Sequence, residues 1–486
     1  MSLSVGVKGG VFLLLGLSLL VRCTHFFMSA RILPMSGDES FYFSGAADLI
    51  RLVTNIDDFG GPVFQSAMDG ILGHGWFLPG MSAVLALVRP FSDSVPVARL
   101  FVGAINFCLF SLIVREVYRV FGGRSALVVS AVGAAFPTMT VFSFVFWGEM
   151  IGGQLLALTL FHLCALHRRV RLGEQVGSFR WATVGMLLLA LIYIRPSLIL
   201  VVPVVLGFTG LVLVHEFGVP IGLRRTLRAT LPMVVVVLLG VLPWSLALSS
   251  RMGGLYLTTT SMELGRVVLY GDQEALDAIT HGGNPWHRVA DHVWARAKRE
   301  AKSYSDVMKE EKKRLTVNAG FEDYVRAVKR GVHGYLLTPN AFLERFRRLS
   351  SGVAPTPEKR SAINAYYAFL ERLNSALWYP LILISMALVT IPSSAARDRW
   401  WFSLLFKAVF LAMVVHPFVA VAHGRHHVAL LPLAIVTTTA VFSSPRAWTL
   451  LSGSSPPRTW TERCCRYAQF LFTFAVAAGF ALVLFF

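Results

Sequence analysis

Charged residues are scarce in this chain: they make up 15% of its 486 residues, whereas 55% of the residues are hydrophobic. A soluble domain of this size carries more charge than that, so the composition excludes an ordinary soluble protein. Many apolar stretches approach the ~20 residues that a membrane-spanning helix requires. The sequence therefore predicts an all-α polytopic membrane protein, with the lipid bilayer as an expected partner.

Cysteine is also rare, with five in the whole chain. Cys23, Cys108 and Cys164 fall within or beside apolar segments, and Cys464 and Cys465 lie in a basic connection. No even set of cysteines lies in an expected external segment, which argues against a disulfide framework. No Cys/His spacing resembles that of a zinc site, so we predict no metal centre.

Acidic residues are outnumbered by basic ones, 27 against 45, which gives a net charge of +18. The basic residues lie mainly in short connections between apolar stretches, where they set orientation by the positive-inside rule. We therefore do not interpret the charge as a signal for nucleic-acid binding. The first apolar stretch, residues 9–28, is too long for the hydrophobic part of a signal peptide, and we expect a retained anchor.

A consistent layout puts the N-terminus and the basic connections in the cytoplasm, with about 11 spans and the C-terminus outside. The expected spans cover residues 9–28, 98–118, 124–145, 149–167, 181–194, 197–214, 230–249, 375–392, 400–420, 427–443 and 467–486. One further apolar segment, Trp76–Val88, is shorter than a span and contains Pro79-Gly80. It fits a juxtamembrane or re-entrant element.

This layout divides the chain into three parts. Residues 1–249 form an N-terminal transmembrane module with an external loop at 29–97, residues 250–374 form an external and mostly helical domain, and residues 375–486 form C-terminal transmembrane helices. Within the external domain, we expect helices over 285–315, 321–335 and 342–349.

An acidic pair, Asp38-Glu39, follows the first apolar stretch and lies in the first expected external loop. Carboxylates are costly to hold near lipid and suit acid/base or metal chemistry, so this pair is the leading catalytic candidate. Tyr42 and later apolar residues continue at helical spacing, which places the pair in the first turn of an amphipathic helix. Two other interpretations stay open: an ordinary polar loop, or a capping box between Ser36 and Glu39, which would not account for Asp38.

Three arginines are expected on the same external side as the acidic pair. Arg99 opens the span at 98–118, Arg195 precedes Pro196 between two spans, and Arg425 precedes the span at 427–443. Each arginine alone could simply snorkel to the membrane interface from a helix end. Together they indicate a pocket for an anionic group, because the guanidinium fork binds phosphate oxygens bidentately.

Glu149 is bracketed by apolar spans at the expected external face. An acidic residue in such a position is a functional candidate, although the helix dipole also favours a carboxylate at a helix start. Four histidines precede or follow Arg425, but their spacing matches no defined metal site; they are His416, His423, His426 and His427.

The order of these features resembles the integral-membrane glycosyltransferases of the GT-C superfamily, in particular the bacterial members related to protein O-mannosyltransferases and to the lipid A aminoarabinose transferase. That family carries an Asp-Glu with a following Tyr in its first external loop, which Asp38, Glu39 and Tyr42 match. It also carries an Arg that opens the next helix, as Arg99 does, and an Arg-Pro at a mid-chain span, as Arg195 and Pro196 do.

Weaker matches extend the resemblance over residues about 35 to 435. Residues 243–265 and 339–343 resemble the beginning and end of the family's external domain, although this chain has Ser250-Arg251-Met252 and Gly271-Asp272 where the family has Arg-Asn and Gly-Asn. The segment from Arg425 to Pro432 resembles a late Arg…Pro motif, with His in place of the usual Tyr.

The resemblance implies a GT-C-like fold and the transfer of a sugar from a polyprenyl-phosphate donor to a glycan, lipid or protein acceptor, at the external (periplasmic) face of the bacterial inner (plasma) membrane. It implies one inverting displacement, with Asp38 as general base and Glu39 sharing that role, orienting the acceptor or only capping the helix. The expected substrate-binding residues are Tyr42, Arg99, Glu149, Arg195 and Arg425. No cofactor is expected, although a weak divalent-cation requirement is compatible with the site.

The external position of these residues agrees with such a donor, because nucleotide sugars are cytoplasmic and the chain has no Gly-rich phosphate loop. Two other classes of protein stay open. A transporter or lipid flippase of cell-envelope precursors would also use buried arginines and carboxylates, but should show paired broken helices or inverted repeats, which the sequence does not. A non-catalytic assembly subunit would not require intact site residues, so the presence of Asp38, Glu39, Arg99 and Arg195 argues against this class.

Overall fold

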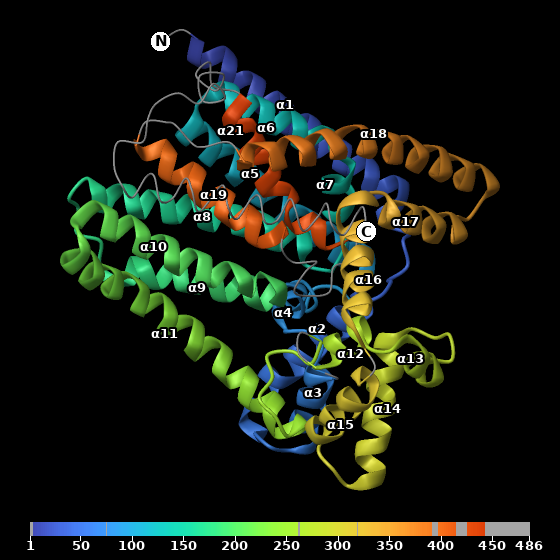
Figure 1. The fold of residues 1–486 in the computed structure, drawn as a ribbon. Coiled ribbons are helices and arrows are strands. Elements are labelled where there is room, and N and C mark those ends of the chain that lie inside the picture. The colour runs from blue at the N-terminus through green and yellow to red at the C-terminus, as the bar shows by residue number, and fades with distance from the viewer. Residues whose placement is uncertain are drawn as a thin grey trace.

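The computed structural model describes residues 3–73, 75–260, 263–317, 319–390, 397–414 and 425–442. Every regular element among these residues is a helix, and they contain no strand (Figure 1). Five helices of the described chain are long and apolar enough to cross a membrane: Gly6–Ala30, Val95–Phe121, Glu149–Arg171, Pro196–Phe217 and Val219–Met252. Shorter apolar helices cover Gly123–Ala135, Ser178–Ile194 and Leu404–Val414. The prediction of an all-α membrane protein is confirmed at this level.

The bundle helices are α1 (Leu3–His25), α5 (Val95–Phe121), α6 (Gly123–Ala135), α8 (Glu149–Arg171), α9 (Ser178–Ile194), α10 (Val201–Phe217), α11 (Val219–Met252), α18 (Pro357–Thr390), α19 (Arg397–Val414) and α21 (Leu431–Phe442). Several of them match the predicted spans within a few residues, but α11 begins at Val219 instead of 230 and α18 at Pro357 instead of 375. The predicted boundary of the external domain at 374 is therefore wrong, because residues 357–374 belong to α18. The prediction of one helix over 124–145 is wrong: α6 ends before Phe136, and a short helix, α7 (Pro137–Phe142), follows. Phe136 is extended because the proline after it disfavours helical backbone. The expected span at 467–486 and the end of the span at 400–420 lie outside the described residues.

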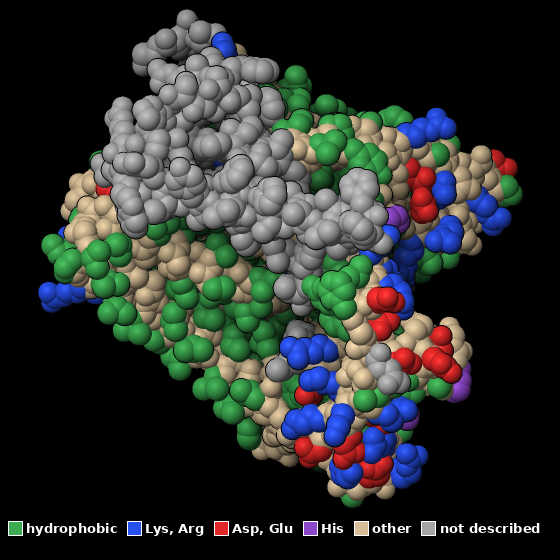
Figure 2. Space-filling view, in the orientation of Figure 1, with side chains coloured by type: hydrophobic (Ala, Val, Ile, Leu, Met, Phe, Trp, Pro, Cys, Tyr) green, Lys and Arg blue, Asp and Glu red, His purple; other side chains and the backbone are tan. Residues whose placement is uncertain are grey.

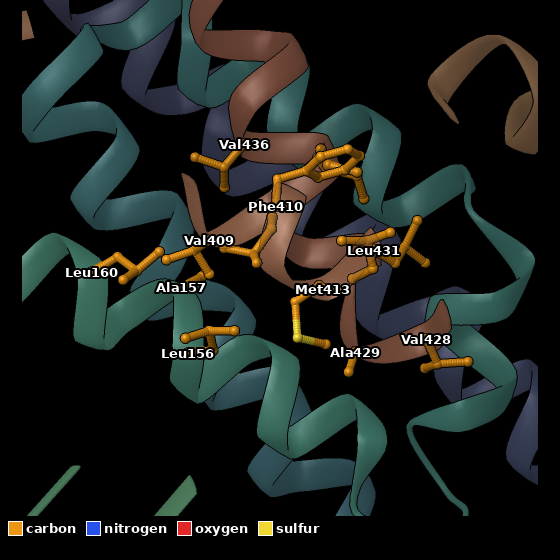
Figure 3. Close-up of a cluster of buried hydrophobic side chains, with 14 of the residues drawn as sticks. Leu156, Ala157, Leu160, Val409, Phe410, Met413, Val428, Ala429, Leu431 and Val436 are labelled. Atoms are coloured by element: carbon orange, nitrogen blue, oxygen red, sulfur yellow. The ribbon is translucent and has the colours of Figure 1, made fainter. Parts of the chain in front are cut away.

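The bundle is held together by apolar side chains from helices far apart in the sequence. Figure 3 shows Leu156, Ala157 and Leu160 of α8 facing Val409, Phe410 and Met413 of α19, with Leu431 of α21 beside them. All of these side chains are buried. On the outer face of α9–α11, by contrast, hydrophobic side chains cover the surface (Figure 2), as lipid contact requires.

The direction of the helices agrees with the expected layout. Near the start of α1, Val7 lies against Gly123 at the start of α6, and near its end Arg22 donates to Ser143, just after α7. Helix α1 therefore runs parallel to the α6–α7 segment, as two outward spans must. The short segment Trp76–Val88 forms α4 (Gly80–Ala86), whose seven residues are too few to span.

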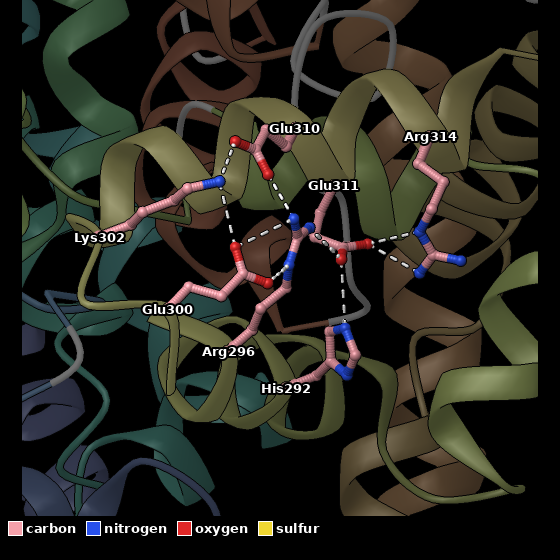
Figure 4. A network of polar contacts seen from close by, with 7 residues as sticks. All are labelled: His292, Arg296, Glu300, Lys302, Glu310, Glu311 and Arg314. Carbon is pink, nitrogen blue, oxygen red and sulfur yellow. Dashed lines mark hydrogen bonds and ion pairs between the residues drawn. The ribbon is translucent and has the colours of Figure 1, made fainter. Parts of the chain in front are cut away.

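The expected external domain contains a break that the predicted helix over 285–315 did not include. A single helix over 285–315 was wrong: α14 (Pro285–Glu300) and α15 (Tyr304–Thr316) are separate, because Ala301 ends α14 with φ 52° and Ser303 caps α15 through its hydroxyl. Figure 4 shows the ion-pair network that joins these two helices; its members are His292, Arg296, Glu300, Lys302, Glu310, Glu311 and Arg314.

The 250–374 segment packs as two parts. Helices α12 (Glu263–Tyr270), α13 (Gln273–Thr280), α14 and α15 share an apolar cluster with the end of α11 and with α3 (Pro62–Leu72) of the first loop. Helices α16 (Phe321–Val332) and α17 (Ala341–Gly352) instead contribute to the core of the bundle. In Figure 2, charged side chains gather on the part that contains α14 and α15, away from the apolar face. This distribution supports the α12–α15 part lying outside the bilayer.

Cysteine labelling tests this layout at two matched glycines. Gly320, between α15 and α16, and Gly177, before α9, are exposed, and a side-chain carbon would meet nothing within 4 Å at either position. In a variant without the five native cysteines, a cysteine at Gly320 should react with a membrane-impermeant maleimide in intact cells. A cysteine at Gly177 should react only after permeabilisation. External labelling at Gly177 would contradict the layout.

Candidate functional site

The residues singled out in the sequence converge at one end of the helix bundle, each at the end of a helix. Asp38 directly precedes α2 (Glu39–Thr54), and Arg99 lies in the first turns of α5. Glu149 is the first residue of α8, and Arg195 directly follows α9. Arg425 directly precedes η5, a short turn (His426–Ala429) that leads into α21. Helix ends bring charged side chains together at the expected membrane surface without placing them along the apolar part of a span.

Four of these residues form a chain of alternating charge. Arg425 Nη2 lies 2.5 Å from Asp38 Oδ2, and Arg425 Nε lies 3.4 Å from Glu149 Oε1. The same Glu149 oxygen lies 3.1 Å from Arg195 Nη2. Arg425 therefore bridges two carboxylates from different helices, and Glu149 bridges two arginines.

The four charged residues differ in how far they are open to the surroundings. The side chains of Asp38 and Arg425 are 18% and 15% exposed, whereas that of Arg195 is 8% exposed and that of Glu149 is fully buried. Asp38 and Arg425 thus form the accessible edge of this row of four charged side chains, and Glu149 lies behind them. Oxygen Oε1 of Glu149 faces both arginines, whereas Oε2 takes part in neither ion pair. A buried carboxylate in this state is suited to accept a hydrogen bond from a ligand hydroxyl.

Glu39 and Arg99 form a separate and fully buried pair. Arg99 Nη2 lies 3.1 Å from Glu39 Oε2, and both side chains are 0% exposed. The Glu39 carboxylate also accepts from the backbone N–H groups of Ser36 at 3.0 Å and of Phe146 at 3.2 Å. One half of the expected capping box, the carboxylate on the Ser36 N–H, is present, but the helix begins at Glu39 itself. The geometry of this pair ties the first loop to the segment that precedes α8.

Tyr42 lies one turn after Asp38 on α2 and is buried, 1% exposed. Burial raises the pKa of its phenol. The nearby arginines Arg195 and Arg425 oppose this increase, and the carboxylates of Asp38 and Glu149 add to it. The hydroxyl therefore stays protonated at neutral pH and can donate a hydrogen bond to a bound oxygen.

Trp147 is a site residue that the sequence did not single out. The guanidinium of Arg425 lies 5.0 Å from the centre of the indole ring, and indole Nε1 donates to the backbone oxygen of Ser36 at 3.2 Å. The ring thus contacts Arg425 on one side and the turn that leads to Asp38 on the other. Its place two residues before Glu149, in an apolar segment, was the only signal available in the sequence.

Gly148 allows Glu149 to meet Arg195. It has φ +80°, and a side-chain carbon built there would lie 2.9 Å from the backbone oxygen of Ile194, next to Arg195. Only glycine adopts this backbone without strain and permits so close an approach. The start of α8 is therefore held directly against the end of α9.

The histidines do not form a metal site in the described part of the chain. His427 is buried and packs on Trp378, with ring centres 4.3 Å apart. His416 and His423 lie outside the described residues. The residues that are described contain no group of three or more His, Cys, Asp or Glu side chains that could hold a metal ion.

Comparisons of the whole chain with protein-family models, curated proteins and solved structures found no match. The chemistry is therefore inferred from the site's own residues. The site combines a partly exposed carboxylate, a buried carboxylate with free acceptor capacity, and two arginines that contact them. Such a set can take a proton from a hydroxyl and stabilise a nearby anionic leaving group.

Proposed function

We propose that this chain is a GT-C type glycosyltransferase, which transfers a sugar from a polyprenyl-phosphate donor to a cell-envelope acceptor at the external face of the bacterial inner membrane. The observation that carries the proposal is the position of Asp38. It is the most exposed of the three site carboxylates, and it lies at one end of the bundle in contact with Arg425. A lipid-linked donor from the bilayer and an acceptor from the aqueous side can both approach such a position.

In the proposed reaction, the Asp38 carboxylate accepts the proton of an acceptor hydroxyl. The hydroxyl oxygen attacks the anomeric carbon from the side opposite the lipid phosphate, and a new glycosidic bond forms with inversion. The bond between the anomeric carbon and the phosphate oxygen breaks, and polyprenyl phosphate leaves with the electron pair. Arg425 and Arg195 lie close enough to Asp38 and Glu149 to reduce the cost of that charge.

The remaining residues take supporting roles in this proposal. Glu149 and Tyr42 supply an acceptor and a donor of hydrogen bonds that orient the sugar. Glu39 and Arg99 pair with each other and are fully buried, so we assign them to positioning the turn that carries Asp38. No cofactor takes part, and a divalent cation is not required by this step.

A deletion strain tests the proposed function. Mass spectrometry of its cell-envelope glycans should show the loss of one sugar from one glycan, lipid or protein, together with accumulation of a polyprenyl-phosphate sugar on the external face of the membrane. Complementation with the wild-type chain should restore the sugar. An unchanged glycan profile would contradict the proposal, and accumulation of the lipid-linked sugar on the cytoplasmic face alone would indicate a flippase.

A further inference from the structure

All three arginines identified in the sequence are already paired with carboxylates. Arg99 pairs with Glu39, Arg195 with Glu149, and Arg425 with both Asp38 and Glu149. A phosphate that relied on these arginines alone would have to compete with a carboxylate held at low exposure. An arginine beside the site that has no carboxylate partner would bind a phosphate without that competition.

Arg345 on α17 has this property. Its side chain is half-buried and forms no ion pair with any residue that the structure describes. Its guanidinium lies 6.0 Å from the centre of the Phe342 ring, on the preceding turn of the same helix. The neighbouring Arg347, by contrast, lies 3.4 Å from Glu371. Arg348, the third arginine of α17, also forms no ion pair with any described residue, but its side chain is exposed. Arg345 is therefore the half-buried arginine of this helix without a carboxylate partner among the described residues.

Arg345 also lies beside the turn that carries Asp38. A side-chain carbon built at Gly37 would lie 3.9 Å from Arg345 Nη2 and 3.9 Å from Trp147 Cζ2. Phe342 packs on Trp147 with ring centres 5.1 Å apart, and Arg425 lies over that same indole. Arg345 and Arg425 are therefore linked through two touching aromatic rings. Gly37 has φ +58° and no side chain, so the turn that carries Asp38 can pass close to Arg345 and Trp147.

We propose that Arg345 binds the phosphate of the polyprenyl-phosphate donor at the rim of the Asp38 site. This inference rests on the proposed function. The guanidinium fork can hold two phosphate oxygens while the leaving oxygen faces Arg425. Because Arg345 has no carboxylate to give up, binding the phosphate does not expose an unpaired buried charge.

Binding of undecaprenyl phosphate to the purified full-length protein tests this assignment. The affinity is measured by native mass spectrometry or microscale thermophoresis for wild type, Arg345→Gln, Arg345→Lys and a control, Arg348→Gln. Arg348 is exposed on the same helix, so its substitution removes the same charge from the same surface. The uncharged alcohol undecaprenol serves as the probe for the lipid chain alone.

We expect Arg345→Gln to weaken undecaprenyl phosphate binding about tenfold to hundredfold, the range for losing a charge-assisted bidentate contact. Arg345→Lys should lie between Gln and wild type, because lysine keeps the charge but not the fork. Binding of undecaprenol to all four proteins, and of undecaprenyl phosphate to Arg348→Gln, should equal that of wild type. Equal thermal unfolding of the four proteins establishes that each is folded.

Three results would overturn the assignment. Arg345→Gln could bind undecaprenyl phosphate as tightly as wild type, or wild type could fail to distinguish the phosphate from the alcohol. Alternatively, binding of phosphatidylglycerol could fall by the same factor as binding of undecaprenyl phosphate, which would identify a site for lipid headgroups in general. Each of these results can occur with the deletion strain still losing its sugar, so the proposed transferase function is tested separately.

Discussion

Asp38→Asn should reduce sugar transfer by about 10²–10⁴-fold, the contribution of a general base. Asparagine keeps the shape of the side chain but cannot accept the proton of the acceptor hydroxyl. The side chain is partly exposed at the edge of the site, so its replacement should leave the yield of folded protein close to that of wild type. Release of polyprenyl phosphate by purified protein measures the effect.

Asp48→Asn is the matched control for this substitution. Asp48 lies on the same helix, α2, is 16% exposed, and forms an ion pair with Arg51 at 3.2 Å. Its substitution therefore removes a carboxylate of similar exposure and a similar ion pair outside the site, and we expect normal turnover. Turnover by Asp38→Asn within a few-fold of the control would contradict a role as base.

The positions of the bundle helices could be predicted from the sequence because each depends on a local apolar stretch and its charged ends. Segments that depend on a single backbone angle could not. Ala301 at φ 52° ends α14, although alanine is a good helix former. Ser303, three residues before Asp306, was the signal for a new helix, and the charged pattern on either side outweighed it. Phe136 interrupts the 124–145 segment because of Pro137, a signal that was present in the sequence and outweighed by the apolar run.

The candidate site residues could be selected from the sequence, but their partners could not. Asp38 and Glu39 are adjacent and chemically alike, yet Asp38 lies at the partly exposed edge of the site, whereas Glu39 is buried against Arg99. Helical geometry separates the two side chains by about 100°, and only the packing of α5 and α8 decides which face is buried. Arg345 was missed for a related reason: α17 carries three arginines, and no sequence pattern shows which of them packs beside the turn that carries Asp38.

The Glu39–Arg99 pair should prove structural, since Arg99→Met would leave the Glu39 carboxylate buried and unpaired. Removal of one partner of a buried ion pair typically costs about 3–5 kcal/mol of folding free energy. Both side chains are 0% exposed, so water cannot replace the lost arginine without opening the packing. We expect Arg99→Met to give a low yield and a lowered thermal unfolding midpoint in detergent.

Arg119→Met is the control on the same helix, because Arg119 is 67% exposed and its ion pair with Glu116 lies at the other end of α5. An exposed pair contributes about 0–1 kcal/mol, so this variant should unfold close to the wild-type midpoint. Adding Glu39→Gln to Arg99→Met removes the unpaired charge and should recover part of the lost stability. If Arg99→Met were instead as stable as wild type but bound the donor weakly, Arg99 would act on the substrate and the Glu39–Arg99 contact would have to open during binding.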